Sequence, residues 1–321
     1  MDIVYFLVQN TLPVAIPLLL VALGGMFAER SGVINLALEG IMLVGAFFGC
    51  LVTYYIGKTN VNAQLILLIA LLAAGNAGAV YSLALSFAAV NMKADQTIVG
   101  TAMNMLVPAL VLLISKMFFM SDGITTTTSF YIKSVPFLGE IPVVGELFFK
   151  KTYMTVYIGF ALLIVAHILL YKTAFGLRLR SCGEHPQAAD SVGINVYKMR
   201  YAGVTISGLL GGLGGFAYAV GVMDGNCNGH TGVAGFGFLA LAVMIFGKWK
   251  PFRILFAALF FAFLRQVANS VMLIPFLNNL HIPKVFYNTL PYVATMVVLA
   301  FTSKRSRAPK AEGIPYDKGT R

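Results

Sequence analysis

The chain has 321 residues, of which 59% are hydrophobic and only 11% are charged, and its mean hydropathy is +0.83. Ordinary globular domains carry roughly 25% charged residues, so this composition excludes a soluble domain and indicates a polytopic membrane protein. In a soluble domain the net charge of +11 would raise the question of a nucleic-acid partner. In a membrane protein the basic residues instead report which side of the bilayer each loop occupies, and no nucleic-acid partner is expected.

Apolar runs long enough to cross a membrane follow one another along most of the chain. A bilayer core of ~30 Å needs about 20 apolar residues in helical form. Nine runs can be placed, at Val4–Phe27, Leu36–Ile56, Val61–Val90, Thr97–Met120, Met154–Tyr171, Tyr201–Met223, Ala234–Phe246, Ile254–Phe276 and Val285–Phe301. The third is long enough to tilt or to break near Gly75, and the short seventh, with Gly232, Gly235 and Gly237, indicates a broken or re-entrant helix. The predicted fold is all-α and polytopic, with about nine (eight to ten) transmembrane helices.

The basic residues divide unequally between the two sides of the membrane. Alternate threading of the nine runs places most of them on one side, in Arg30, Lys93, the loops 172–200 and 248–253, and the tail from Lys304. The positive-inside rule makes this side cytoplasmic and puts the N-terminus outside; an even number of spans would move only the N-terminus. We therefore expect a transmembrane domain over residues 1–303 and a disordered, basic cytoplasmic tail over residues 304–321.

Cysteines and candidate metal ligands are few. Cys50 lies in a predicted span, Cys182 in a cytoplasmic loop and Cys227 in an outer loop, so no two share a compartment and no disulfide is expected. Asp224, Cys227 and His230 are residue types that bind metals. Their irregular spacing in a loop rich in glycine and asparagine favours a turn or a flexible gate, so neither a metal nor a cofactor is expected on this chain. The four histidines are scattered over different spans and sides, so we expect no catalytic residues.

A polar, basic stretch from Gly176 to Arg200 interrupts the apolar pattern. Pro186 suits the first position of a helix and Gly193 suits the residue just past its end, which predicts a short helix over Pro186–Val192. Two helical turns are marginal alone in water, so a partner must hold them. The helix offers a small apolar face, made of Ala188, Ala189 and Val192. We predict that this face docks in a partner's groove; the alternative is an amphipathic helix at the lipid headgroups.

Three blocks of the sequence resemble permease subunits of ATP-binding cassette importers of the branched-chain amino acid, simple sugar and nucleoside group. The blocks are Glu29–Ala46, the loop Gly176–Arg200 with Ser207–Gly215 behind it, and Gly235–Pro251. They follow one another in the family's order over most of the chain, and their amino-acid sequences are most similar to the nucleoside branch. The resemblance implies an importer of the bacterial plasma membrane whose solute is a nucleoside. A simple sugar, riboflavin or a branched-chain amino acid is the alternative solute within the same architecture.

The resemblance also implies partners. They are a second homologous permease subunit in a heterodimer, ATP-binding cassette ATPase subunits, and an extracytoplasmic solute-binding lipoprotein. Because the chain has no Gly-x-x-x-x-Gly-Lys-Ser/Thr phosphate loop, ATP and Mg²⁺ are expected on the ATPase subunits. The predicted helix then becomes a coupling helix, and ATPase coupling is expected of Arg178, Arg180, Glu184, Pro186, Ala188, Ala189, Val192 and Gly193. An alternative from another class is an ion-coupled secondary transporter, which needs midplane carboxylates and often inverted repeats.

Polar side chains inside the predicted spans are costly, so they tend to line cavities or interfaces. The candidates for the transport pathway are Asn10, Asn35, Glu39, Asn104, Arg265, Gln266 and Asn269. Asn35 and Glu39 are four residues apart and would share a helix face, as would Arg265 and Asn269. For each of them the alternative is a structural hydrogen bond or a cap, and Glu39 in particular suits the bracing of a discontinuous helix.

Two further features favour packing roles. Gly208 with Gly212, and Gly211 with Gly215, form overlapping Gly-x-x-x-Gly pairs that let helices approach closely in lipid. We expect them to pack helices within this chain. Trp249, between two lysines, suits an aromatic anchor at the membrane interface, and the alternative is a second contact with the ATPase.

Overall fold

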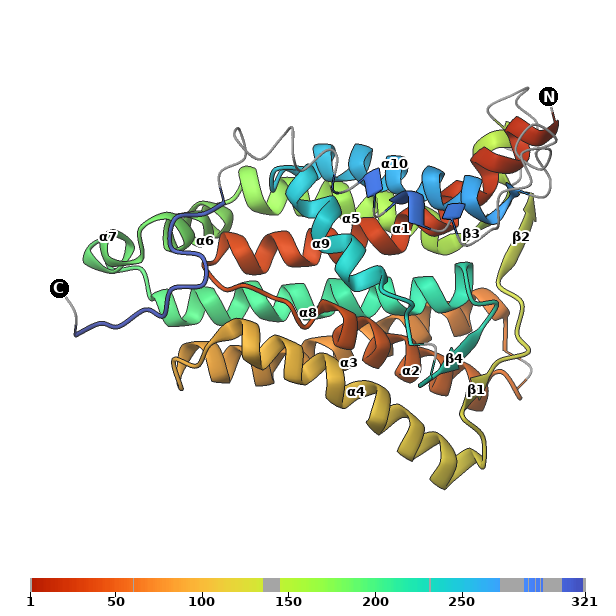
Figure 1. Cartoon of the computed structure of the whole chain (residues 1–321), viewed down its shortest axis with the longest axis horizontal. Helices are drawn as coiled ribbons and strands as arrows, with labels where there is room; N and C mark the ends of the chain where they lie inside the picture. The colour runs from red at the N-terminus through yellow and green to blue at the C-terminus, as the bar shows by residue number, and fades with distance from the viewer. Residues whose placement is uncertain are drawn as a thin grey trace.

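The computed structural model describes residues 2–59, 61–134, 145–230, 232–271, 286–287, 289–291, 293–294, 296 and 308–319. The described chain is a bundle of helices with two short antiparallel strand pairings at one end (Figure 1). The helices are α1 (Asp2–Arg30), α2 (Leu38–Ile56), α3 (Ala63–Val90), α4 (Gln96–Phe119), α5 (Met154–Tyr171), α6 (Ala174–Glu184), α7 (Pro186–Ser191), α8 (Val196–Gly221), α9 (Phe236–Phe246) and α10 (Pro251–Asn269), with a π-helical turn over Gly145–Phe149. The predicted all-α, polytopic character is confirmed.

Seven described helices are long and apolar enough to cross a membrane: α1, α2, α3, α4, α5, α8 and α10. The predicted short seventh run is α9, whose 11 residues span only ~16 Å, about half of a bilayer core. The ninth predicted run, Val285–Phe301, lies largely outside the described residues, as does the end of the eighth. α3 continues through Gly75 without a break.

Two helices, α1 and α8, form the centre of the bundle. Both are almost wholly buried, whereas most of α4 is exposed and its second half leans away from the bundle (Figure 1). The glycines of α8 face its neighbours: a Cβ at Gly212 or Gly215 would overlap backbone atoms of α3 or α2, at Ala74 and Met42 respectively. A Cβ at Gly208 would overlap Ser82 of α3, and one at Gly211 would lie 2.8 Å from the side chain of Ile41. The structure therefore places all four glycines at contacts within this chain.

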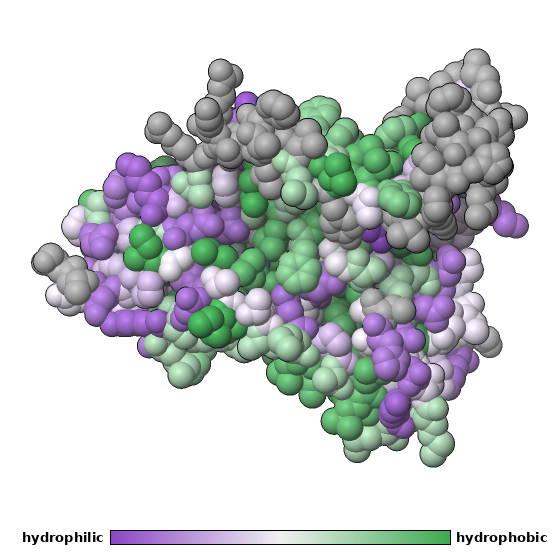
Figure 2. All heavy atoms as spheres, viewed as in Figure 1, coloured by the Kyte–Doolittle hydropathy of each residue, from purple (hydrophilic) through white to green (hydrophobic). Residues whose placement is uncertain are grey.

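The two ends of the bundle differ in structure. The end that holds α6 and α7 lies at the left of Figure 1, and we call it the α6–α7 end. At the other end β1 (Gly123–Thr125) pairs with β4 (Asn226–Asn228), and β2 (Tyr131–Ser134) pairs with β3 (Lys150–Tyr153), both antiparallel. Hydrophilic residues gather at the α6–α7 end, while apolar residues cover much of the middle of the molecule (Figure 2). This distribution suits a membrane protein whose apolar middle lies in the bilayer.

Residues 308–319, which we call the tail segment, pack against the α6–α7 end. The side chains of Ala311 and Tyr316 are buried, and the amide of Ala311 donates to the carbonyl of Gly183 at 2.9 Å. The prediction of a disordered tail is therefore wrong over the tail segment. The high content of charged residues predicted disorder, but Ala311 and Tyr316 provide buried apolar contacts that hold the tail segment in place.

The cysteines are placed differently from the prediction. Cys50 near the end of α2 and Cys227 of β4 are both buried and contact each other, because the α8–α9 connection folds back over the end of α2. The expectation that no two cysteines share a compartment is wrong, although all three cysteines are free thiols. His230 lies 3.7 Å from Asp122, so the three metal-binding residue types of this loop face different partners.

Candidate functional site

The predicted docking helix exists as α7, and a second helix precedes it. Pro186 occupies the first turn of α7, and Gly193 after its end has φ +84°, a conformation that glycine adopts without strain. α6 was not predicted, although Thr173 is a usable signal: its hydroxyl accepts a hydrogen bond from the amide of Gly176 at 3.2 Å and caps the helix. The polar stretch is thus two consecutive helices and not one.

The predicted apolar face of α7 is divided between two directions. Pro186 and Ala189 are buried and point into the protein, whereas Ala188 and Val192 are exposed, Val192 by 74%. Ala189 belongs to a small apolar cluster inside the protein, so it is not free to contact a partner. The prediction that Ala188, Ala189 and Val192 form one docking face is therefore wrong. Ala189 lies on the inner side of this short helix, where its packing stabilises the helix.

Beside α7 the surface is hollowed into a groove of about 670 Å³. Its walls come from α6, from the α7–α8 connection and from the start of α8, and they combine apolar and basic side chains. The lining residues are Leu177, Arg178, Ser181, Val192, Gly193, Ile194, Asn195, Lys198 and Met199. The groove combines apolar side chains with the cations of Arg178 and Lys198, so it suits a protein surface that presents apolar and acidic groups.

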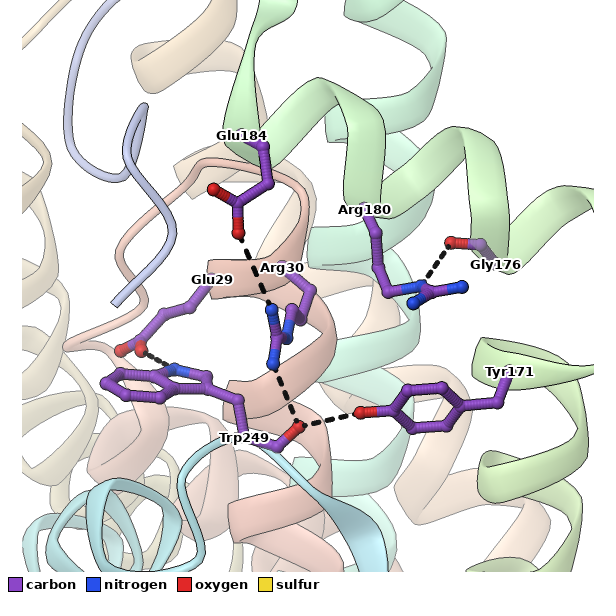
Figure 3. A network of polar contacts seen from close by, with 7 residues as sticks. All are labelled: Glu29, Arg30, Tyr171, Gly176, Arg180, Glu184 and Trp249. Atoms are coloured by element: carbon purple, nitrogen blue, oxygen red, sulfur yellow. Dashed lines mark hydrogen bonds and ion pairs between the residues drawn. The ribbon is translucent and has the colours of Figure 1, made fainter. Parts of the chain in front are cut away.

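Arg180 and Glu184, predicted to contact an ATPase, interact with their own chain (Figure 3). The Nε atom of Arg180 donates to the carbonyl of Gly176 at 3.3 Å, and its guanidinium lies 4.9 Å from the ring centre of Tyr171. Glu184 lies 3.8 Å from Arg30 at the end of α1. Of the three charged residues predicted to flank the coupling helix, Arg178 is the one that is exposed and lines the groove.

Trp249 is the centre of this network and is only 4% exposed. Its indole N–H donates to the carboxylate of Glu29, and its carbonyl accepts from Arg30 and from the hydroxyl of Tyr171, each at 3.4 Å (Figure 3). The prediction of an interface anchor is wrong, because the indole is inside the protein. The network joins the ends of α1 and α5 to the α9–α10 turn, and through Glu184 to α6. Sequence analysis could not find these pairs, since their members lie up to 220 residues apart.

Glu312 of the tail segment lies near this network, facing the charges of Glu29 and Arg30. Burial raises the pKa of Glu312 to about 7, although the positive charge of Arg30 opposes the shift. Because the docked pKa exceeds the ordinary value of 4.5, the docked tail holds a proton that an undocked tail would release. Docking should therefore weaken as the pH rises from about 4.5 through about 7, and then level off.

This pH dependence gives a testable prediction. Cleavage of the tail segment by a protease should be faster at pH 8 than at pH 6, after correction for the protease's own activity. The Glu312→Gln variant removes this carboxyl, so the ratio of its corrected cleavage rates at pH 8 and pH 6 should be smaller than in the unmodified chain. An unchanged pH ratio in this variant would show that another group controls docking.

Three of the predicted pathway residues lie around the break between α1 and α2. Asn35 is fully buried and its Nδ2 donates to the hydroxyl of Ser207 at 2.8 Å. Asn104 of α4 accepts from the amide of Gly40 at 2.7 Å and donates to the carbonyl of Leu36 at 2.6 Å. Both side chains are thus engaged in holding the backbone around the start of α2, in line with the structural alternative.

Glu39, the third of them, caps α9. Its two carboxylate oxygens accept hydrogen bonds from the amides of Gly235 at 2.8 Å and Gly237 at 2.6 Å. A negative charge at a helix N-terminus satisfies unpaired amides and complements the helix dipole. A discontinuous helix is braced as the sequence suggested, but the helix is α9 and not α2. Glu39 forms no ion pair with Arg265 within the described residues.

The remaining pathway candidates are dispersed. Arg265 lies 4.8 Å above the ring of Phe236 at the start of α9, and the amide of Gln266 donates to Ser270 within α10. Asn269, on the same helix, is exposed. Asn10 is half-buried and donates to the carbonyl of Phe6 in its own helix. Arg265 and Asn269 therefore retain side-chain surface that could meet a solute.

Comparisons with known proteins agree with this architecture. A family model described as a branched-chain amino acid transport system permease component matches residues 7–300. The guanosine ABC transporter permease protein NupQ of Bacillus subtilis is 46% identical, with 100% of both chains covered. The nucleoside ABC transporter permease protein NupC of Lactococcus lactis is 39% identical over 97% of this chain and 96% of its own length.

NupB, also a nucleoside ABC transporter permease protein of Lactococcus lactis, is 28% identical over 49% of this chain and 43% of its own length. No solved structure matches the chain. The family resemblance read from the sequence is confirmed, and permease components are transport subunits and not enzymes. The chain therefore belongs to the branched-chain amino acid transport system permease component family and is a multi-pass permease subunit of an ATP-binding cassette transporter.

Proposed function

We propose that this chain is a permease subunit of an ATP-driven importer of nucleosides in the bacterial plasma membrane. The observation that carries the proposal is its full-length similarity, at 46% identity, to a permease named for guanosine transport. A second full-length relative, 39% identical, is named for nucleosides. Permeases that conserve so much of their length share their pathway architecture, and the nucleoside is the solute that both names support.

We propose that the α6–α7 end is cytoplasmic and receives the ATPase, which carries the ATP and Mg²⁺. The exposed part of α7 and the groove beside it supply the docking surface, with Val192 and Leu177 as apolar contacts and Arg178 and Lys198 as cations. The basic character of this surface agrees with the positive-inside rule. Closure of two ATPases would then push α7 and reorient the pathway between its two open states.

We further propose that a second, similar permease completes the pathway and that a solute-binding lipoprotein delivers the solute at the β1–β4 end. Support for a heterodimer comes from Lactococcus lactis, in which two different nucleoside permease proteins, NupC and NupB, are both similar to this chain. Arg265 and Asn269 of α10 are our candidates for solute contact, whereas the side chain of Asn10 in α1 donates to Phe6 of its own helix. Asn35, Glu39, Asn104 and Gln266 are assigned to bracing the pathway, because their side chains are bonded within the chain.

The test of the function is to purify the chain with its bound partners and measure ATP hydrolysis in nanodiscs together with the cognate binding protein. Guanosine, adenosine and uridine should stimulate hydrolysis, whereas glucose, riboflavin and leucine should not. Stimulation by one of the latter alone would replace the proposed solute. Transport by the isolated chain, driven by an ion gradient without any ATPase, would overturn the importer class.

The docking surface gives a separate prediction. Val192→Asp places a charge on an apolar contact that is 74% exposed in the free subunit, and should reduce recovery of the ATPase with the purified chain about tenfold. The matched control is Ser121→Asp, which adds the same charge at an exposed position beside β1, at the opposite end of the bundle from the groove. Equal losses in both variants would mean that charge alone, and not the groove, governs docking.

A further inference from the structure

The tail segment is bonded through its main chain to three separate parts of the α6–α7 end. The amide of Ala311 donates to Gly183 at the end of α6, at 2.9 Å, and the amide of Gly313 donates to Gly32 after α1, at 3.3 Å. The carbonyl of Ile314 accepts from Nη1 of Arg200 in α8 at 3.0 Å. Arg200 is only 1% exposed, so the donor of this last bond is buried, whereas the side chain of Ile314 is exposed.

Tyr316 is the main side-chain anchor of the tail segment. It is 5% exposed and joins an apolar cluster with Cys182 of α6, Ala189 of α7 and Val196 of α8. Its ring lies 5.5 Å from that of Tyr197. One tail residue therefore packs against the inner side of α7 and against the two helices that flank it.

Two neighbouring residues of the tail segment then form ion pairs in different directions. Asp317 lies 2.6 Å from Lys93 in the α3–α4 connection, and Lys318 lies 3.8 Å from Asp190 of α7. Exposed ion pairs contribute little to stability, so we assign the holding of the tail to Tyr316 and the main-chain bonds. The ion pairs nevertheless show that the tail segment bridges α7 and the α3–α4 connection.

The six residues of α7 are too few to form a stable helix alone. A helix that receives force from an ATPase must be held rigidly against the elements that it moves. We propose that the tail segment is a strut that stays docked throughout the transport cycle and positions α7, so that displacement of α7 is passed to α1, α8 and the α3–α4 connection. This inference rests on the proposed coupling role of α7, and it assigns Tyr316 as a positioning residue for that role.

The first test compares Tyr316→Ala with Tyr316→Phe in the complete transporter reconstituted in proteoliposomes. The alanine variant should keep its ATPase but import at least fivefold less solute per ATP hydrolysed, while the phenylalanine variant, which keeps the ring, should stay within twofold of the unmodified complex. A chain ending at residue 307 should behave like the alanine variant. Normal solute import per ATP in the alanine variant would overturn the strut.

A second test separates a strut from a latch that must open, and it needs no knowledge of the solute. Cysteines at positions 190 and 318, introduced as Asp190→Cys and Lys318→Cys in a chain that keeps its three buried native cysteines, are joined by a short bifunctional thiol reagent. A strut requires the same cross-linking yield with and without an ATP analogue, and unchanged ATPase activity after cross-linking. A cross-linking yield that falls on nucleotide binding, or ATPase activity that is blocked by the cross-link, would overturn the strut. Failure of nucleosides to stimulate the ATPase would instead contradict only the proposed solute.

Discussion

Replacing Gly215 by alanine is expected to destabilise the protein by about 3 kcal/mol, the upper end of the range for overpacked cores. The added Cβ would overlap the carbonyl group of Met42 in α2, and a backbone carbonyl cannot rotate away as a side chain can. α8 would therefore have to move away from α2, which weakens the centre of the bundle. The measurement is thermal unfolding followed by the fluorescence of Trp249, the single tryptophan, which is buried.

Gly211→Ala is the matched control, one helical turn earlier on the same helix. Its Cβ would lie 2.8 Å from the Cγ2 methyl group of Ile41, a side-chain contact that requires Ile41 to shift and not a clash with a backbone carbonyl, so we expect a loss of about 1 kcal/mol, the lower end of the range for overpacked cores. The gain in helix propensity on replacing glycine by alanine is the same at both positions and cancels in the comparison. Equal destabilisation of the two variants would contradict the assigned close approach of α8 and α2.

The membrane-spanning pattern could be predicted from the sequence because each span is a local property. Runs of apolar residues mark α1 to α5, α8 and α10, and their length follows from the thickness of the bilayer. The same local logic located α7, since proline and glycine fix the backbone at its two ends. It missed α6 because that helix is polar on average, although Leu179, Cys182 and Gly183 on its buried face recur at helical spacing.

The contacts of individual polar residues could not be predicted, because their partners are distant in the sequence. Glu39 caps a helix almost 200 residues away, and Trp249 donates to Glu29 at a similar separation. A single sequence shows which side chains are costly to bury but not which backbone amides they reach. The tail segment illustrates the same limit, since its burial depends on Tyr316 meeting a cluster built from three other helices.

Glu39→Gln is expected to cost about 3 kcal/mol of stability and to reduce transport. An amide side chain has one oxygen in place of two, so it can accept from Gly235 or from Gly237 but not from both. One backbone amide and the new NH₂ group would then lack partners in the protein interior, at about 1–3 kcal/mol each. The loss should be seen as a lower unfolding temperature by the fluorescence of Trp249 and as lower ATP-driven uptake.

Arg265→Gln serves as the control for charge, since Arg265 is the basic residue among the predicted pathway candidates and is not paired with Glu39 in the described residues. In the structure it lies over the ring of Phe236 instead, an interaction of about 0.5–1 kcal/mol, so its removal should change stability far less.

The pair of variants, Glu39→Gln and Arg265→Gln, also distinguishes the two classes of transporter. If Glu39 carried a coupling proton, as in an ion-driven carrier, its neutral glutamine replacement would fold with normal stability and lose transport alone. Because two amides at the start of α9 depend on the carboxylate, we expect stability and transport to fall together.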